Sequence, residues 1–215
     1  MKYSNTIVIN GKFLEQKLSG VQRFAYEVIK ELDNNASNSR FRFILAISKK
    51  AQISNIPSLK NIIIKQIGKT GGIFWEQFTL ANFIRKNNAV GLHFCNSIPF
   101  FAPKGFVTIH DISHKVNPQY IDSFKLWLKT RWHLLQFRIS TRHSLGIFTV
   151  SEFSKSQICS VYHIPEKKVR VVYCGWQHFI KDKASTDIQK FPFLKKWRIL
   201  LQYGKYGSKQ KLQVD

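Results

Sequence analysis

The sequence has 215 residues, of which 34 are Lys or Arg and 12 are Asp or Glu, so its formal net charge is +22. This length suits one large domain, or one domain with part of another. The hydrophobic fraction of 44% is sufficient for a packed core and excludes a disordered chain. No segment reaches the ~18 consecutive apolar residues of a membrane-spanning helix, and residues 1–10 lack the apolar core of a signal peptide.

The charged residues are unevenly distributed along the chain. No acidic residue lies between Asp33 and Glu76, and none lies between Glu76 and Asp111, whereas Lys and Arg recur throughout. The positive charge therefore belongs to the folded surface, and it indicates an anionic partner: nucleic acid, an anionic membrane leaflet or phosphorylated small molecules. The three cysteines, Cys95, Cys159 and Cys174, are widely spaced and predict neither a disulfide framework nor a zinc site, which favours the reducing cytoplasm.

Apolar runs of strand length alternate with runs of helical periodicity. This alternation predicts βαβ units, and hence an α/β fold with a Rossmann-like parallel sheet flanked by helices. The predicted strands are residues 6–10, 41–48, 62–65, 91–94, 106–110, 147–150 and 169–173. The predicted helices are residues 20–32, 75–85, 123–144 and 153–162.

Two of these helices carry specific signals. In residues 20–32 the apolar side chains fall on one face, and Ser19 with Gln22 predicts a capping box at the helix start. The segment 123–144 is apolar nearly all round and flanked by Lys and Arg. It is therefore interpreted as a half-buried helix whose basic side chains extend to solvent, or as a helix that also touches anionic lipid head groups.

The pattern changes near the carboxyl end. Residues 181–197 are mostly polar and contain Pro192, and residues 198–203 resemble a strand that ends at Gly204. We therefore expect a domain over residues 1–180, a linker over 181–197 and the truncated start of a second domain over 198–215.

Several short motifs suggest chemistry. Residues 68–71 (GKTG) are not a phosphate-binding loop, because the motif requires a glycine where Ile63 stands. His110, Asp111 and His114 are close in sequence, but ligands four residues apart share a face only on a helix, and His110 ends a predicted strand. We therefore expect no metal.

Five positions are candidates for ligand binding because of where they lie in the predicted fold. His110 and Asp111 follow a parallel strand, where open α/β sheets bind ligands, although Asp111 could equally cap the following turn. Gly20 and Arg23 lie at a helix amino terminus, which favours phosphate or sugar hydroxyls. Ser151 begins another helix, and a purely structural cap is the simpler interpretation.

The ordered set of motifs resembles the amino-terminal half of glycosyltransferase family 4. The matching segments are 9–14 (INGKFL), 19–24 (SGVQRF), 107–111 (VTIHD), 149–154 (TVSEFS) and 163–175 (HIPEKKVRVVYCG), with 199–204 (ILLQYG) resembling the first strand of the second domain. The resemblance implies a retaining enzyme with the two-domain GT-B fold, which transfers a sugar from a nucleotide-sugar donor, usually without a metal ion. In such enzymes the amino-terminal domain mainly binds the acceptor.

The resemblance also implies roles for individual residues. His110 would hydrogen-bond the transferred sugar as the catalytic residue, Gly20 would let the backbone approach donor or acceptor, and Arg23, Asp111 and Ser151 would bind substrate. Lys205 and Lys209 lie near the family's diphosphate-binding position, and Cys174 stands where the family commonly has Asn. The expected acceptor is a lipid-linked saccharide used in the synthesis of a bacterial surface polysaccharide such as lipopolysaccharide. A lipid-linked acceptor would bring the protein to an anionic membrane, and this contact would explain the basic surface.

The chain ends before the glutamate pair that orients the donor, so we expect a truncated and inactive hexosyltransferase half. It would be cytoplasmic, with peripheral attachment to the inner face of the cell membrane as an option. Two alternatives remain: a non-catalytic basic module or gene remnant that binds anionic membrane, and a nucleic-acid-binding protein. The basic residues are scattered and no nucleic-acid module is recognisable, so no specific nucleic-acid partner is expected.

Overall fold

The computed structural model describes residues 4–116 and 124–175. The chain divides into two units, residues 1–174 and 175–215, and the strands and helices named below belong to the first. The predicted linker over 181–197 and second domain over 198–215, with Lys205 and Lys209, lie outside the described residues.

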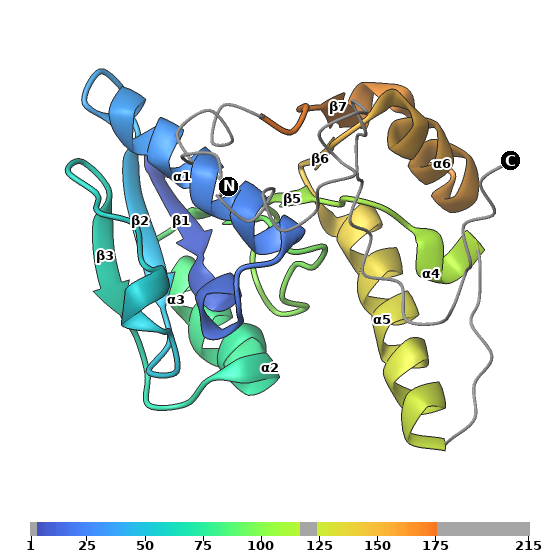
Figure 1. The fold of residues 1–215 in the computed structure, drawn as a ribbon, viewed down its shortest axis with the longest axis horizontal. Helices are drawn as coiled ribbons and strands as arrows, with labels where there is room; N and C mark the ends of the chain where they lie inside the picture. Colours follow the sequence, from blue (N-terminus) through green and yellow to red (C-terminus); the bar gives the residue numbers. More distant parts are fainter. Residues whose placement is uncertain (1–3, 117–123, 176–215) are drawn as a thin grey trace, which may run out of the picture. The chain divides into compact units, whose positions relative to one another are not determined.

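A parallel sheet forms the centre of the first unit (Figure 1). Its strands have the order β3-β2-β1-β4-β5-β6-β7, and every pair of neighbours is parallel. The strands are β1 (Thr6–Asn10), β2 (Arg42–Ile47), β3 (Ile63–Gln66), β4 (Val90–His93), β5 (Phe106–Thr108), β6 (Gly146–Thr149) and β7 (Val169–Val171). This confirms the predicted fold class and the seven predicted strand positions, and it is the architecture expected of the amino-terminal half of a GT-B fold.

Helices connect the strands. They are α1 (Gly20–Ala36), α2 (Gly72–Phe74), α3 (Ala81–Lys86), α4 (Ser113–Val116), α5 (Phe124–His143) and α6 (Glu152–Tyr162), together with the π-helical turn η3 (Trp75–Leu80) and the 3-10 turns η1 (Gly11–Glu15), η2 (Ile53–Asn55) and η4 (Glu166–Lys168). The predicted helix 75–85 forms, but its first part is wound as η3, and the helix predicted over 20–32 continues to Ala36.

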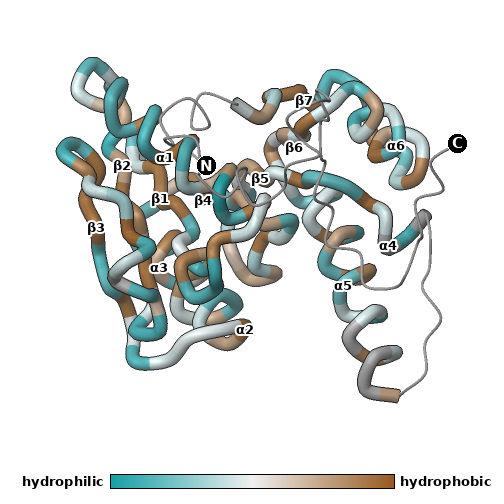
Figure 2. The backbone as a smooth tube through the Cα atoms, in the orientation of Figure 1, coloured by the Kyte–Doolittle hydropathy of each residue, from teal (hydrophilic) through white to brown (hydrophobic). Residues whose placement is uncertain are grey.

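The two faces of the sheet pack against different helices. In β1, Ile9 contacts α1 through Ala25 and Ile29, whereas the adjacent Val8 packs with Trp75 and Leu80 of η3. Strand residues alternate between faces, so α1 covers one face and η3 with α3 the other. On that second face, Val107 and Ile147 pack against α5 and α6. Figure 2 shows that apolar residues are frequent in the strands, whereas polar and apolar residues are mixed along the helices.

The strand order reverses direction between β1 and β4. The chain proceeds from β1 outward to β2 and β3, then crosses back to β4 and continues outward through β5, β6 and β7. The loops that follow β1 and β4 therefore diverge to opposite sides and leave a crevice at the carboxyl ends of these strands, which is where open parallel sheets bind ligands.

Candidate functional site

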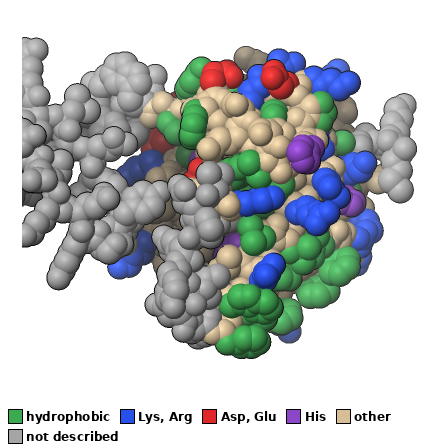
Figure 3. All heavy atoms as spheres, turned by 90° about the vertical axis from the view of Figure 1, so that its right-hand side faces the viewer, with side chains coloured by type: hydrophobic (Ala, Val, Ile, Leu, Met, Phe, Trp, Pro, Cys, Tyr) green, Lys and Arg blue, Asp and Glu red, His purple; other side chains and the backbone are tan. Residues whose placement is uncertain are grey.

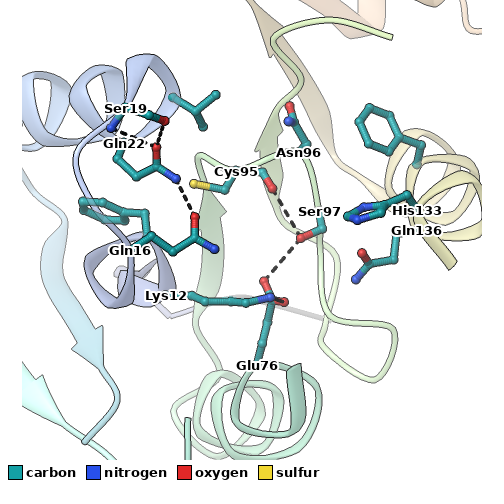
Figure 4. Close-up of a pocket in the computed structure, with 13 residues that line it drawn as sticks. Lys12, Gln16, Ser19, Gln22, Glu76, Cys95, Asn96, Ser97, His133 and Gln136 are labelled. Atoms are coloured by element: carbon teal, nitrogen blue, oxygen red, sulfur yellow. Dashed lines mark hydrogen bonds and ion pairs between the residues drawn. The ribbon is translucent and has the colours of Figure 1, made fainter. Parts of the chain in front are cut away.

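A pocket of about 270 Å³ lies at the carboxyl ends of β1 and β4 (Figure 4). Its walls come from η1, the start of α1, η3, the loop after β4, and α5. Polar side chains dominate the lining, among them Lys12, Gln22, Glu76, Asn96, Ser97 and Gln136. The volume lies just below the ~300–1,000 Å³ typical of small-molecule sites, so the pocket suits a ligand about as large as one sugar residue.

Glu76 forms the floor of this pocket and is only 1% exposed. Its Oε1 accepts hydrogen bonds from Asn10 Nδ2 at 2.8 Å and from Ser97 Oγ at 3.3 Å. Its Oε2 accepts a hydrogen bond from Lys12 Nζ at 2.5 Å. A buried carboxylate is tolerated because it is paired and hydrogen-bonded on both oxygens, and these three donors hold its position.

Asn10 connects the end of β1 to this floor. Its Oδ1 accepts a hydrogen bond from the backbone N–H of Lys12 at 3.1 Å, so it caps η1 and orients the residue that pairs with Glu76. Its Nδ2 also lies 3.3 Å from His93 Nδ1. Burial lowers the pKa of His93 to about 3, so the ring is neutral and Nδ1 can accept this hydrogen bond.

Gln136 of α5 forms the opposite wall. The side chain is 5% exposed, lines the pocket, and has no hydrogen-bond partner for Nε2 within the described residues. One helical turn farther on, Ser140 Oγ accepts a hydrogen bond from the backbone N–H of Ile98 at 2.9 Å, which fixes the loop after β4 against α5. Because an unsatisfied buried amide is costly, a ligand oxygen that accepts a hydrogen bond from Gln136 Nε2 would be bound favourably.

The amino terminus of α1 borders the same pocket. The predicted capping box is present, with the backbone N–H of Ser19 donating to Gln22 Oε1 at 3.3 Å, and both residues line the pocket. Gly20 lies between them in sequence and is exposed, and a Cβ atom added there would meet nothing within 4 Å. The fold of this chain therefore does not itself require glycine at this position.

His110 and Arg23 lie outside the pocket lining. The His110 Nε2 atom bonds the carbonyl oxygen of Phe94 at 3.0 Å, and the ring packs edge-on against Phe24. Burial lowers its pKa, although the Phe94 hydrogen bond and the charge of Asp111 act in the opposite direction. Arg23 is exposed on α1 and pairs with Glu27 at 3.6 Å.

Asp111 and Ser151 both accept hydrogen bonds at the start of a helix. Asp111 Oδ1 accepts from the backbone N–H of Ser113 at 3.0 Å and from its hydroxyl at 2.6 Å, at the start of α4. Ser151 is the N-cap of α6, where its Oγ accepts from the backbone N–H of Ser154 at 3.1 Å. These are the structural roles that the sequence left open for both residues, and neither residue lines the pocket.

The polar residues that converge on the pocket were not candidates from the sequence. Lys12 lies in a segment that matters there only for the family resemblance, and Gln136 is one polar position on an apolar helix. For Glu76 a signal exists, because it is the sole acidic residue between Asp33 and Asp111. An isolated carboxylate in a long basic stretch, on a largely apolar helix, is costly unless it is paired, which indicates a specific partner.

Comparison with known families agrees with this architecture. The family model Glycosyltransferase Family 4 matches residues 18–177. A comparison with curated proteins gives no match. Within the described part of the chain, no helix has the length and apolar character needed to cross a bilayer. Because the family model covers residues 18–177, which is most of the chain, the chain belongs to glycosyltransferase family 4.

Proposed function

We propose that this member of glycosyltransferase family 4 forms the acceptor-binding half of a retaining hexosyltransferase. The enzyme would transfer a hexose from a nucleotide-sugar to a lipid-linked saccharide during synthesis of a bacterial surface polysaccharide. The observation that carries the proposal is the polar pocket at the carboxyl ends of β1 and β4, because its size and its mixture of donors and acceptors suit a sugar residue.

In the proposed reaction an acceptor hydroxyl oxygen forms a bond to the anomeric carbon of the donor hexose. The bond between that carbon and the nucleotide diphosphate breaks, and the hydroxyl proton leaves with the diphosphate. The pocket holds the acceptor sugar, and positioning of this kind supplies much of the rate enhancement in a reaction between two substrates. Gly20 lies in sequence between the pocket-lining Ser19 and Val21 and would allow close approach of a ligand, and the neutral His110 would hydrogen-bond the transferred sugar.

A basic and apolar surface supports attachment to an anionic membrane. Phe74, Phe78 and Phe101 are exposed and stack in a row, with ring centroids 6.3 and 5.6 Å apart. On α5, Trp127 is exposed and Arg131 lies 5.3 Å from the centre of its ring. Apolar and basic side chains lie side by side on the face shown in Figure 3.

Such a surface suits a lipid-linked acceptor. Aromatic side chains insert at the level of the head groups, and each Lys or Arg near an anionic leaflet contributes about 1 kcal/mol. The formal charge of +22 acts in the same direction. We therefore propose peripheral attachment to the cytoplasmic face of the cell membrane, where lipid-linked saccharide acceptors would be accessible.

The test is co-sedimentation of the chain with two sets of vesicles that have equal anionic lipid content. One set also contains lipid-linked saccharides extracted from a bacterial envelope. Electrostatic attraction weakens with salt, so at moderate salt we expect retention mainly on the saccharide-bearing vesicles. Equal retention on both sets would contradict acceptor binding and favour a simple basic membrane module.

A further inference from the structure

The charges at the floor of the pocket cancel each other. Lys12 and Glu76 form a single ion pair, and the carboxylate is almost fully buried whereas the Lys12 side chain is 23% exposed. The floor is therefore polar but close to neutral, on a protein whose surface is strongly basic. A site for phosphate or carboxylate normally contains uncompensated Lys and Arg side chains, so this floor does not suit an anionic group.

Hydrogen-bonding capacity remains on both sides of the pair. An ammonium group has three N–H donors, and within residues 4–116 and 124–175 one donor of Lys12 is used by Glu76. A carboxylate has about four acceptor sites, and Asn10, Ser97 and Lys12 occupy three at Glu76. The floor thus presents donors beside a remaining acceptor.

Gln136 adds further donors from the opposite wall. Its Nε2 amide is buried, faces the pocket and lacks a partner in the described part of the chain, as the view in Figure 4 illustrates. A hydroxyl group both donates and accepts, whereas a phosphate or carboxylate only accepts. Adjacent sugar hydroxyls therefore match the floor, while an anionic group would find the Lys12 ammonium already neutralised by Glu76.

On the basis of the proposed function, we infer that this pocket selects an uncharged sugar residue of the acceptor. Lys12 and Glu76 bind neighbouring hydroxyls, and Gln136 binds a further oxygen. By pairing with Lys12, Glu76 removes the uncompensated positive charge that a carboxylate or a phosphate would need. Glu76 is thus a specificity-determining residue, and its charge is the feature that discriminates.

The test compares two ligands that differ only at C6, where one has a neutral hydroxymethyl group and the other a carboxylate. Methyl glucoside and methyl glucuronide are titrated into the 215-residue chain by saturation-transfer NMR, with other neutral methyl hexosides as further probes. We expect the wild-type chain to prefer the neutral glycoside by roughly tenfold, because Lys12 is paired with Glu76 and offers the glucuronide carboxylate no uncompensated positive charge. In Glu76→Gln the Lys12 ammonium loses its carboxylate partner and can pair with the glucuronide, so we expect the preference for the neutral glycoside to fall by about tenfold or reverse.

Two further variants separate recognition from folding. Gln136→Leu removes the amide donors of the opposite wall and is expected to weaken the binding of both ligands by a similar factor. This result can be obtained even where Glu76→Gln folds poorly. Gln157→Leu, a half-buried glutamine on α6 outside the pocket lining, is the matched control and should change neither. Thermal unfolding of each variant verifies the fold.

The outcomes also distinguish this inference from the proposed function. Equal wild-type affinity for the two ligands, or an unchanged preference in a folded Glu76→Gln variant, would overturn the inference. Absence of glycoside binding, with retention on saccharide-bearing vesicles intact, would likewise overturn it while the proposed function stands. Charge-selective glycoside binding without any preference for saccharide-bearing vesicles would support the pocket inference and contradict the proposed acceptor.

Discussion

Asn10 Nδ2 donates a 2.8 Å hydrogen bond to Glu76 Oε1, joining residues that are 66 positions apart in the sequence. The bond links the end of β1 to η3 on the second face of the sheet, and Lys12 closes the same carboxylate from the other side. The polar floor of the pocket therefore also connects two layers of the fold, so its residues influence stability as well as binding.

Replacing Lys12 with Met should destabilise the fold through this carboxylate. Breaking a buried pair by removing one partner costs ~3–5 kcal/mol, and we expect about 3 kcal/mol here because Lys12 is partly exposed. The double variant Lys12→Met/Glu76→Gln should recover more than half of that loss, because no unpaired charge remains. Urea denaturation of the wild type, the two single variants and the double variant measures the coupling energy between Lys12 and Glu76. Additive losses of stability would argue against a buried pair.

Gly20→Ala should leave the fold intact. No atom lies near the added Cβ, and alanine favours helix formation over glycine by ~1 kcal/mol in a helix interior, so we expect an unchanged or slightly higher melting temperature. If Gly20 serves close approach of a ligand, the same variant should weaken retention on saccharide-bearing vesicles. A lower melting temperature would show that glycine is needed for folding.

Gly68 and Gly72 form a matched pair for separating backbone strain from steric overlap. Both have positive φ, +70° and +68°, but a Cβ at Gly68 would lie 2.7 Å from Thr79 Cγ2 whereas one at Gly72 meets nothing within 4 Å. Alanine at Gly72 should cost about 1 kcal/mol from strain alone, and alanine at Gly68 should cost more. Adding Thr79→Ala should reduce the excess at Gly68. Equal costs in chemical denaturation would contradict the steric contribution.

Burial of His93 predicts a loss of stability on mild acidification. Its pKa in the fold is about 3, below the ordinary value of 6.5, so the unfolded chain binds a proton that the folded chain does not. The folded state pays no such penalty above pH 6.5, and its stability decreases progressively as the pH falls from 6.5 towards 3. At pH 5 the loss in the free energy of unfolding is about 2 kcal/mol. His93→Gln should show a shallower dependence between pH 7 and pH 5 in urea titrations. An identical slope would argue against a neutral, buried ring.

Asp33 should act at lower pH. Burial alone would raise its pKa, but hydrogen bonds from the backbone N–H groups of Lys60, Asn61 and Ile62, together with the Lys60 charge, lower it overall. Asp33 therefore contributes stability above its ordinary pKa of 3.8, and this contribution disappears as the pH falls through the folded-state value. The stability difference between wild type and Asp33→Asn should narrow below pH 4; a constant difference would contradict it.

Local periodicity was sufficient to predict the sheet and its main helices. The strands and α1 were predicted because alternating, continuous and 3.6-residue apolar patterns depend on neighbouring residues alone. Ser19 with Gln22 predicted the start of α1 for the same reason, since a cap is a local interaction. Boundaries were less certain: the strand predicted to His110 ends at Thr108, where Asn96 Oδ1 accepts the backbone hydrogen bond of His110 in place of a neighbouring strand.

The pocket was decided by tertiary structure. Gly20 was a candidate because it lies where a helix begins, and His110 because it follows a strand. Both positions are visible in the sequence. Lys12, Glu76 and Gln136 converge only because β1 and β4 are neighbours in the sheet and because η3 and α5 cover the same face. Strand order and helix rotation arise from packing between distant segments, so no local pattern records which polar side chains will share a pocket.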